Sequence, residues 1–164
     1  MKTRLIIVGA IALAVMIVSF WQITRQTTFQ AAESQTLLSK MNVTVGSSTF
    51  AVEIASTPEQ SAKGLSSRAT LDAKTGMLFV FSPAEQATFW MKDMNFPLDL
   101  VWIKNEKVTD ITRNVQPPTK GTAEDKIPTY QAKELIDYVL EISPKDGESL
   151  KIGDSVTLNK TEVL

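Results

Sequence analysis

The stretch GMLFVFSPAEQATFWMKDMNFPLDLVWI, residues 76–103, decides the fold of this chain. It holds two of the three tryptophans and four of the seven phenylalanines, a density that is typical of a hydrophobic core. Four ionisable residues lie among them, Glu85, Lys92, Asp93 and Asp99. Because a charge inside a core needs a partner or a ligand, this stretch predicts both the centre of the fold and the place of a site.

Length and composition bound the class of protein. The chain has 164 residues, 43% hydrophobic and 21% charged, which fits one globular domain with a terminal extension. A net charge of -1 and a pI near 5.5 argue against a nucleic-acid partner, since such proteins usually carry a basic surface. There is no cysteine and no histidine, which excludes disulfides, thiol nucleophiles, imidazole metal ligands and the Ser-His-Asp triad. We expect no metal and no other cofactor.

The amino terminus predicts a membrane segment. Lys2 and Arg4 precede an apolar run over residues 5–23, which as a helix nearly spans the roughly 30 Å hydrocarbon layer. Lys2, Arg4 and the free amine put more positive charge before this run than Arg25 puts after it. The positive-inside rule therefore places the rest of the chain outside the cytoplasm. We expect residues 1–24 to be an uncleaved signal anchor in the cytoplasmic membrane. A cleaved signal peptide, the alternative, would release a secreted protein.

Strand patterns dominate the remainder. Residues 25–40 are polar and predict a tether, the folded domain is expected over residues 41–160, and residues 161–164 form a tail. The expected strands are residues 43–45, 50–54, 77–81, 88–92, 98–103, 107–115, 138–142 and 155–158. Residues 77–81, 88–92 and 98–103 are apolar on both faces, as are strands at the centre of a barrel or sandwich.

Two helix starts and one long loop complete the pattern. Thr57-Pro58-Glu59-Gln60 is typical of a capping box, with a stop at Gly64, and Ser143-Pro144 resembles a second start. Residues 116–132 contain three prolines and predict a loop that is functional or mobile. The fold is therefore predicted to be mainly β, a small closed or partly closed barrel-like domain with one or two short helices.

A series of motifs resembles one family in order and spacing. They are Lys63-Gly64-Leu65, Arg68, Leu71, Gly76-Met77-Leu78-Phe79, Phe81, Phe89-Trp90-Met91-Lys92, Pro97-Leu98-Asp99, Val139-Leu140-Glu141 and Gly153-Asp154. The chain resembles the domain of unknown function 192 family, also called uncharacterised protein family 0127, over most of residues 43–158. The resemblance implies a compact, mainly β domain, often exported, and no established activity. The chain departs from the family at Asp93-Met94-Asn95, where an Asn-Thr pair is usual, and over residues 116–132.

Five residues are candidates for a ligand-binding site, namely Arg68, Trp90, Lys92, Asp99 and Glu141. Strand alternation puts Asp99 and Glu141 on apolar faces, where lone charges are costly, and puts Lys92 on the face of Trp90. The four charged residues either line a pocket mouth over Trp90 or form ion pairs that hold loops on the barrel, and we favour the ion pairs. Trp90 either stacks on a ligand or plugs one end of the barrel, and we favour the plug.

Three functions stay open at this point. The first is a non-enzymatic binding or accessory module that uses the aromatic and charged cluster around Trp90. The second is a hydrolase-like enzyme that uses the carboxylates of Asp99 and Glu141. The third is a structural partner of another envelope protein through residues 116–132. Expected partners are the membrane, through residues 5–23, and either a small-molecule ligand or an envelope protein. We expect Met77, Met91 and Met94 to fill the core rather than bind a soft metal.

Overall fold

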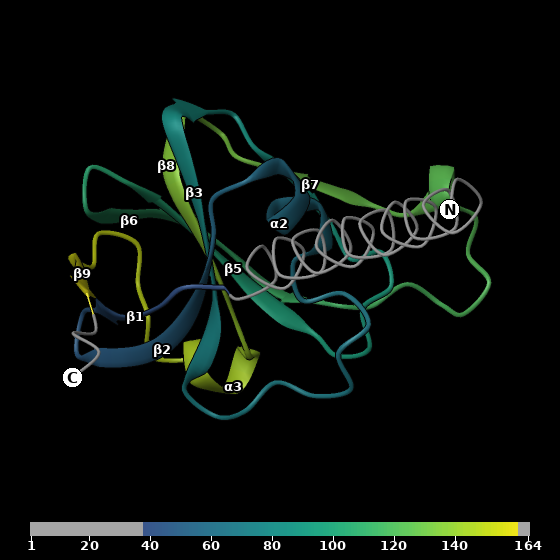
Figure 1. Cartoon of the computed structure of the whole chain (residues 1–164), viewed down its shortest axis with the longest axis horizontal. Helices are drawn as coiled ribbons and strands as arrows, with labels where there is room; N and C mark the ends of the chain where they lie inside the picture. The colour runs from purple at the N-terminus through teal and green to yellow at the C-terminus, as the bar shows by residue number, and fades with distance from the viewer. Residues whose placement is uncertain (1–37, 161–164) are drawn as a thin grey trace, which may run out of the picture. The chain divides into compact units, whose positions relative to one another are not determined.

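The computed structural model describes residues 38–160, so the predicted anchor at residues 5–23, most of the tether and the tail lie outside the described residues. Its strands are β1 (Lys40–Val45), β2 (Ser48–Ala55), β3 (Thr75–Glu85), β4 (Thr88–Trp90), β5 (Leu98–Lys104), β6 (Lys107–Val115), β7 (Thr129–Gln131), β8 (Ile136–Ile142) and β9 (Val156–Lys160) (Figure 1). The helices are α2 (Pro58–Lys63), α3 (Pro144–Gly147) and the 3-10 turn η1 (Glu124–Lys126). This confirms a mainly β domain with two short α-helices. Among residues 38–160, no helix has the length and apolar character needed to cross a bilayer.

Seven strands form one mixed sheet in the order β6-β5-β8-β3-β2-β1-β9. The predicted hairpin of β1 and β2 is observed, with Val45 paired to Ser48 across the turn. β2 and β3 run parallel, which requires a crossover, and residues 56–74 with α2 supply it. β4 and β7 form a separate antiparallel pair.

The large sheet curls into a half-barrel whose edge strands meet at one end (Figure 1). Lys107, at the start of β6, forms an isolated bridge with Ser155, just before β9. Beside it, the amide of Val108 donates to the carbonyl of Asp154 at 3.0 Å, and the amide of Gly153 donates to the carbonyl of Val108 at 2.8 Å. Of the two predicted forms, closed and partly closed, the sheet takes the partly closed one.

The three strands in the middle of the fold, β5, β8 and β3, pack apolar side chains on both faces. One cluster packs on one face of the sheet, where Phe50, Leu78, Ile103 and Leu140 are all almost fully buried. The other face carries a second cluster, and successive residues of each strand alternate between the two clusters. The expectation that residues 77–81 and 98–103 are central strands is therefore confirmed.

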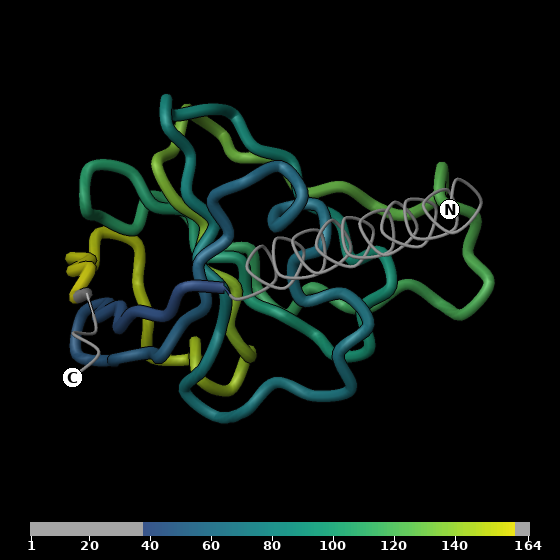
Figure 2. Tube along the Cα trace, viewed as in Figure 1, coloured from purple at the N-terminus to yellow at the C-terminus, as the bar shows by residue number. Residues whose placement is uncertain are grey.

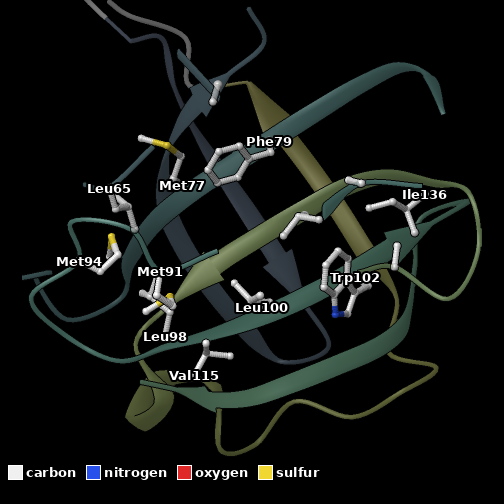
Figure 3. Packing of buried hydrophobic residues seen from close by; sticks show 14 residues of the cluster. Leu65, Met77, Phe79, Met91, Met94, Leu98, Leu100, Trp102, Val115 and Ile136 are labelled. Carbon is white, nitrogen blue, oxygen red and sulfur yellow. The ribbon is translucent and has the colours of Figure 1, made fainter. Parts of the chain in front are cut away.

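The second cluster is drawn in Figure 3, where Met77 and Phe79 of β3 and Leu100 and Trp102 of β5 share one face. Leu65, Met91 and Met94 pack against them from segments outside the large sheet. All three methionines of the central stretch are buried, at 0%, 3% and 8% exposure. Their predicted role in the core is confirmed.

Residues 88–92 differ from the prediction of a central strand. β4 has only three residues, Thr88 and Trp90 are exposed, and its partner is the equally short β7 rather than the large sheet. β7 lies inside the segment expected to be one long loop. Before β7, the chain over residues 116–127 runs out from the sheet and returns (Figure 2).

The helix signals of the sequence are confirmed. Thr57 accepts a hydrogen bond from the amide of Gln60 at 3.3 Å, and the Gln60 side chain accepts one from the amide of Thr57 at 3.2 Å. This capping box starts α2, and Gly64 ends it with a φ of 48°, a conformation that glycine adopts without strain. Ser143 caps α3 with its hydroxyl, which accepts a hydrogen bond from the amide of Asp146 at 3.3 Å.

Candidate functional site

A cavity of about 270 Å³ is bounded by α2 and the residues after it, by β3 and by β4. Four aromatic residues line it, Phe79 and Phe81 from β3 and Phe89 and Trp90 from β4. Further lining comes from residues 61–66, Met94, Glu85 and Glu141. The cavity therefore combines an aromatic wall with several polar and charged side chains, which could orient a small ligand.

Phe89 fixes the geometry of the aromatic wall. Its ring stands at 90° to the rings of Phe79 and Phe81, with centroids 4.9 and 6.5 Å away, and at 84° to the ring of Trp102 at 5.7 Å. Edge-to-face pairs of this kind contribute roughly 0.5–1.5 kcal/mol each beyond their buried area. These contacts hold the short strand β4 on the large sheet and so hold one wall of the cavity.

The segment after α2 is bonded to the turn after β4. The amide of Ser67 donates to the carbonyl of Asp93 at 2.8 Å, and the Asn95 side-chain amide donates to the carbonyl of Arg68 at 2.8 Å. Met94, between Asp93 and Asn95, lines the cavity and is 8% exposed. Met94 is thus part of the cavity wall, and the bonds of Asp93 and Asn95 hold it there.

Among the described residues that line the cavity, Glu141 is the one that is both charged and deeply buried. It sits on β8, paired in register with Met77 of β3 on one side and Leu100 of β5 on the other, and is 5% exposed. Among residues 38–160, no hydrogen bond or ion pair joins its carboxylate to another group, and no side-chain oxygen or nitrogen is both fully enclosed and unbonded, so the carboxylate opens onto the cavity. Burial, which penalises the charged form, raises the pKa of Glu141 to about 8.

The close approach of β3 and β8 brings Glu141 to this position. Gly76 pairs with Ile142, and a Cβ atom at Gly76 would collide with the backbone oxygen of Glu141. Only a residue without a side chain allows the two backbones to pair here.

Arg68 and Lys92 do not line the cavity. The two terminal guanidinium nitrogens of Arg68 donate to the carboxylate of Glu53, at 2.9 and 2.6 Å. This pairing lowers the pKa of Glu53. Lys92 pairs with Glu124 of η1. The Lys92 ammonium also lies 5.2 Å from the centre of the Trp90 ring, so the two side chains meet as expected.

Asp99 belongs to a network on the opposite face of the sheet. Its carboxylate accepts hydrogen bonds from the Arg113 guanidinium and from the amide of Asn114, both at 2.7 Å. Arg113 also donates to the carbonyls of Gly147 and Leu150. The network joins β5 and β6 to α3, and Gly147 leaves room for it, because a Cβ atom there would overlap the Asp99 carboxylate.

The predicted pocket mouth of four charged residues is therefore not formed. Arg68, Lys92 and Asp99 form ion pairs elsewhere, which is the arrangement that we favoured. Asp99 pairs in register with Ile142, the neighbour of Glu141, so the two carboxylates point to opposite faces of the sheet. A hydrolase site that combines Asp99 with Glu141 is excluded by this geometry.

The prediction that Trp90 plugs one end of the barrel is wrong. Trp90 lies on β4, outside the large sheet, is 43% exposed and lines the cavity. Of the two tryptophans within residues 38–160, the buried one is Trp102, whose indole nitrogen donates to the Thr112 hydroxyl at 2.9 Å.

The five candidates from the sequence did not include residues 61–66 or Glu85, although Glu85 lies in the stretch that predicted a site. The capping box predicted α2, but only the fold shows that its carboxyl end lies over Phe79, whose ring is 3.4 Å from the place where a Cβ atom of Gly64 would stand. No group of three or more acidic residues within residues 38–160 is arranged to hold a metal ion.

Comparison with known proteins identifies a family and a fold. The profile of the family DUF192, described as "Uncharacterized ACR", matches residues 41–158. The fold is similar to that of a "putative transcription regulator" from Sinorhizobium meliloti, with a TM-score of 0.65 and 25% identity, covering 74% of this chain and 95% of that one. It is also similar to a protein of unknown function from Novosphingobium aromaticivorans, with a TM-score of 0.65 and 30% identity, covering 72% and 84%. No curated protein matches the chain.

Asp99→Asn is expected to lower the free energy of unfolding by roughly 1–3 kcal/mol, because it weakens a buried charge-assisted network. Urea unfolding of the full-length protein measures this. Lys133→Ala is the matched control, since Lys133 is exposed in its pair with the half-buried Asp110, and its loss should change stability by less than about 0.5 kcal/mol. Equal effects of the two substitutions would contradict a structural role of Asp99.

Stability of the ligand-free protein is expected to fall as the pH rises from about 5 to about 8. In the unfolded chain the Glu141 carboxyl loses its proton near its ordinary pKa of 4.5, whereas the folded protein keeps that proton up to a pKa of about 8. The folded state binds the extra proton across this window, so stability declines by up to about 1.4 kcal/mol per pH unit. Urea unfolding at several pH values measures the slope, and Glu141→Gln should flatten it. An unchanged slope in that variant would show that another group titrates.

Proposed function

This chain belongs to the DUF192 family, and we propose that its domain is a non-enzymatic binding module that takes a small, largely apolar ligand into the cavity between α2, β3 and β4. The observation that carries the proposal is the buried carboxylate of Glu141, which lines an aromatic chamber without a partner among residues 38–160.

A lone carboxylate at this position is costly to the fold. Its register neighbours, Met77 and Leu100, are apolar and fully buried, and an apolar residue in place of Glu141 would pack with them without desolvating a charge. A buried ionisable group that weakens the fold and lines a cavity is a candidate for function. The cavity volume, about 270 Å³, lies just below the range of about 300–1,000 Å³ for ligand sites, so the ligand is smaller than a typical drug.

Binding accounts for the site better than catalysis does. Acid–base chemistry at a single carboxyl usually needs a second group held close to the same substrate. Among the described residues that line the cavity, the other ionisable ones are Lys63 and Glu85, and both are exposed. Asp99 is bonded on the far face of the sheet.

Trp90→Ala is expected to weaken binding of small aromatic compounds about tenfold or more, because it removes an apolar wall of the cavity. Isothermal titration calorimetry of the full-length protein against a panel of such compounds, each with one polar group, measures the effect. Leu135→Ala is the control, since Leu135 is an exposed hydrophobic residue that does not line the cavity. If no compound binds, or if both variants bind like the original protein, the proposal fails.

We also propose that the domain works outside the cytoplasm, anchored by residues 5–23. The support is the charge balance around that apolar run, with Lys2 and Arg4 before it and Arg25 after it. Alkaline phosphatase fused to the carboxyl end should be active and should sediment with membranes. Deletion of residues 5–23 should abolish that activity. Activity in the soluble periplasmic or secreted fraction would indicate cleavage instead, and an inactive fusion would contradict export.

A further inference from the structure

We propose that the ligand of this cavity is a small organic cation, an ammonium group on an apolar body, with Glu141 as its counter-ion and the aromatic wall around it. The inference rests on the proposed binding function and adds the chemical class of the ligand.

The charges that face the cavity favour a cation. Three ionisable residues line it, Lys63 from α2, Glu85 from β3 and Glu141 from β8. Carboxylates outnumber the single ammonium, and the only one of the three that is buried is the carboxylate of Glu141. An interaction between charges is strongest away from water, so the ionised form of Glu141 would attract a bound cation there and repel a bound anion.

Lys63 is not a counter-ion of Glu141. It is exposed at the end of α2, and among residues 38–160 no ion pair joins it to Glu141. Glu85 is likewise exposed. The buried carboxylate is therefore available to a ligand that enters from outside.

The aromatic wall adds a second attraction for a cation. The faces of Phe and Trp rings carry partial negative charge, and rings grouped around one space bind ammonium groups, quaternary ones included. Phe79, Phe81, Phe89 and Trp90 all line this cavity. The Lys92 nitrogen, which does not line the cavity, lies 5.2 Å from the centre of the Trp90 ring, so this ring already makes one cation–π contact.

Binding of a cation should release a proton. The carboxyl of Glu141 holds its proton near neutral pH in the empty cavity, because burial raises its pKa to about 8. A cation beside it stabilises the carboxylate, so the neutral carboxyl plus the cation give the ion pair plus one proton in solution. Lys63 and Glu85, the other ionisable residues that line the cavity, are exposed and remain in contact with water.

Three probes with one aromatic body test the inference, namely benzyltrimethylammonium, benzyl alcohol and benzoate. Calorimetry with the full-length protein at neutral pH should give an affinity for the cation at least about tenfold above that for the alcohol, and weaker binding still for benzoate. Repeating the cation titration in buffers of different ionisation enthalpy should show up to one proton released per cation bound. This probe cannot lose a proton itself, so the released proton comes from the protein.

Glu141→Gln should remove both the preference for the cation and the proton release, while binding of benzyl alcohol continues and shows that the variant is folded. Glu148→Gln is the matched control and should keep both, since Glu148 is exposed and does not line the cavity. If the alcohol or benzoate binds as tightly as the cation, or if the preference survives Glu141→Gln, the inference is overturned and the binding function stands. If neither these probes nor the wider panel of aromatic compounds binds, the binding function fails with it.

Discussion

The close pairing of β3 with β8 is the contact on which the rest of the structure depends. β3 joins the parallel neighbour β2 on one side to β8 on the other, and through β8 to β5. Gly76 makes this approach possible, since any side chain there would collide with the backbone of Glu141. The central strands are buried on both faces, and the pairing places Glu141 in register between Met77 of β3 and Leu100 of β5.

Two buried carboxylates on neighbouring strands have opposite surroundings. Asp99 faces Arg113 and the amide of Asn114, so its charge is paired and it holds β5, β6 and α3 together. Glu141 faces an aromatic cavity instead, and desolvation alone acts on it. Each is a carboxylate within an apolar strand, so the local sequence predicts for both of them a charge on an apolar face of the sheet. The face of the sheet and the chain segment that covers it make one residue structural and the other a candidate for binding.

The cavity exists because small elements cover the second face of the sheet incompletely. α2 and β4 are six and three residues long, and they are held by the edge-to-face contacts of Phe89 and by the bonds of Ser67 and Asn95 rather than by long ladders of backbone pairs. Short covering elements leave a space that a continuous helix or sheet would fill. Trp90 stays partly exposed at this space for the same reason.

The sequence by itself determined the features that depend on neighbours a few residues apart. These include the β1–β2 hairpin, the capping box and glycine stop of α2, the bounds of β6 and the burial of the three methionines, because alternation and cap chemistry act over short distances. Only the tertiary structure decided the parallel pairing of β2 with β3, the pairing of β4 with β7 and the partners of the charged residues. Arg68 meets Glu53, and Lys92 meets Glu124, across 15 and 32 positions of the chain. No local pattern encodes such contacts. Only the folded structure, in which these ion pairs are formed, shows that Glu141 has no partner among residues 38–160.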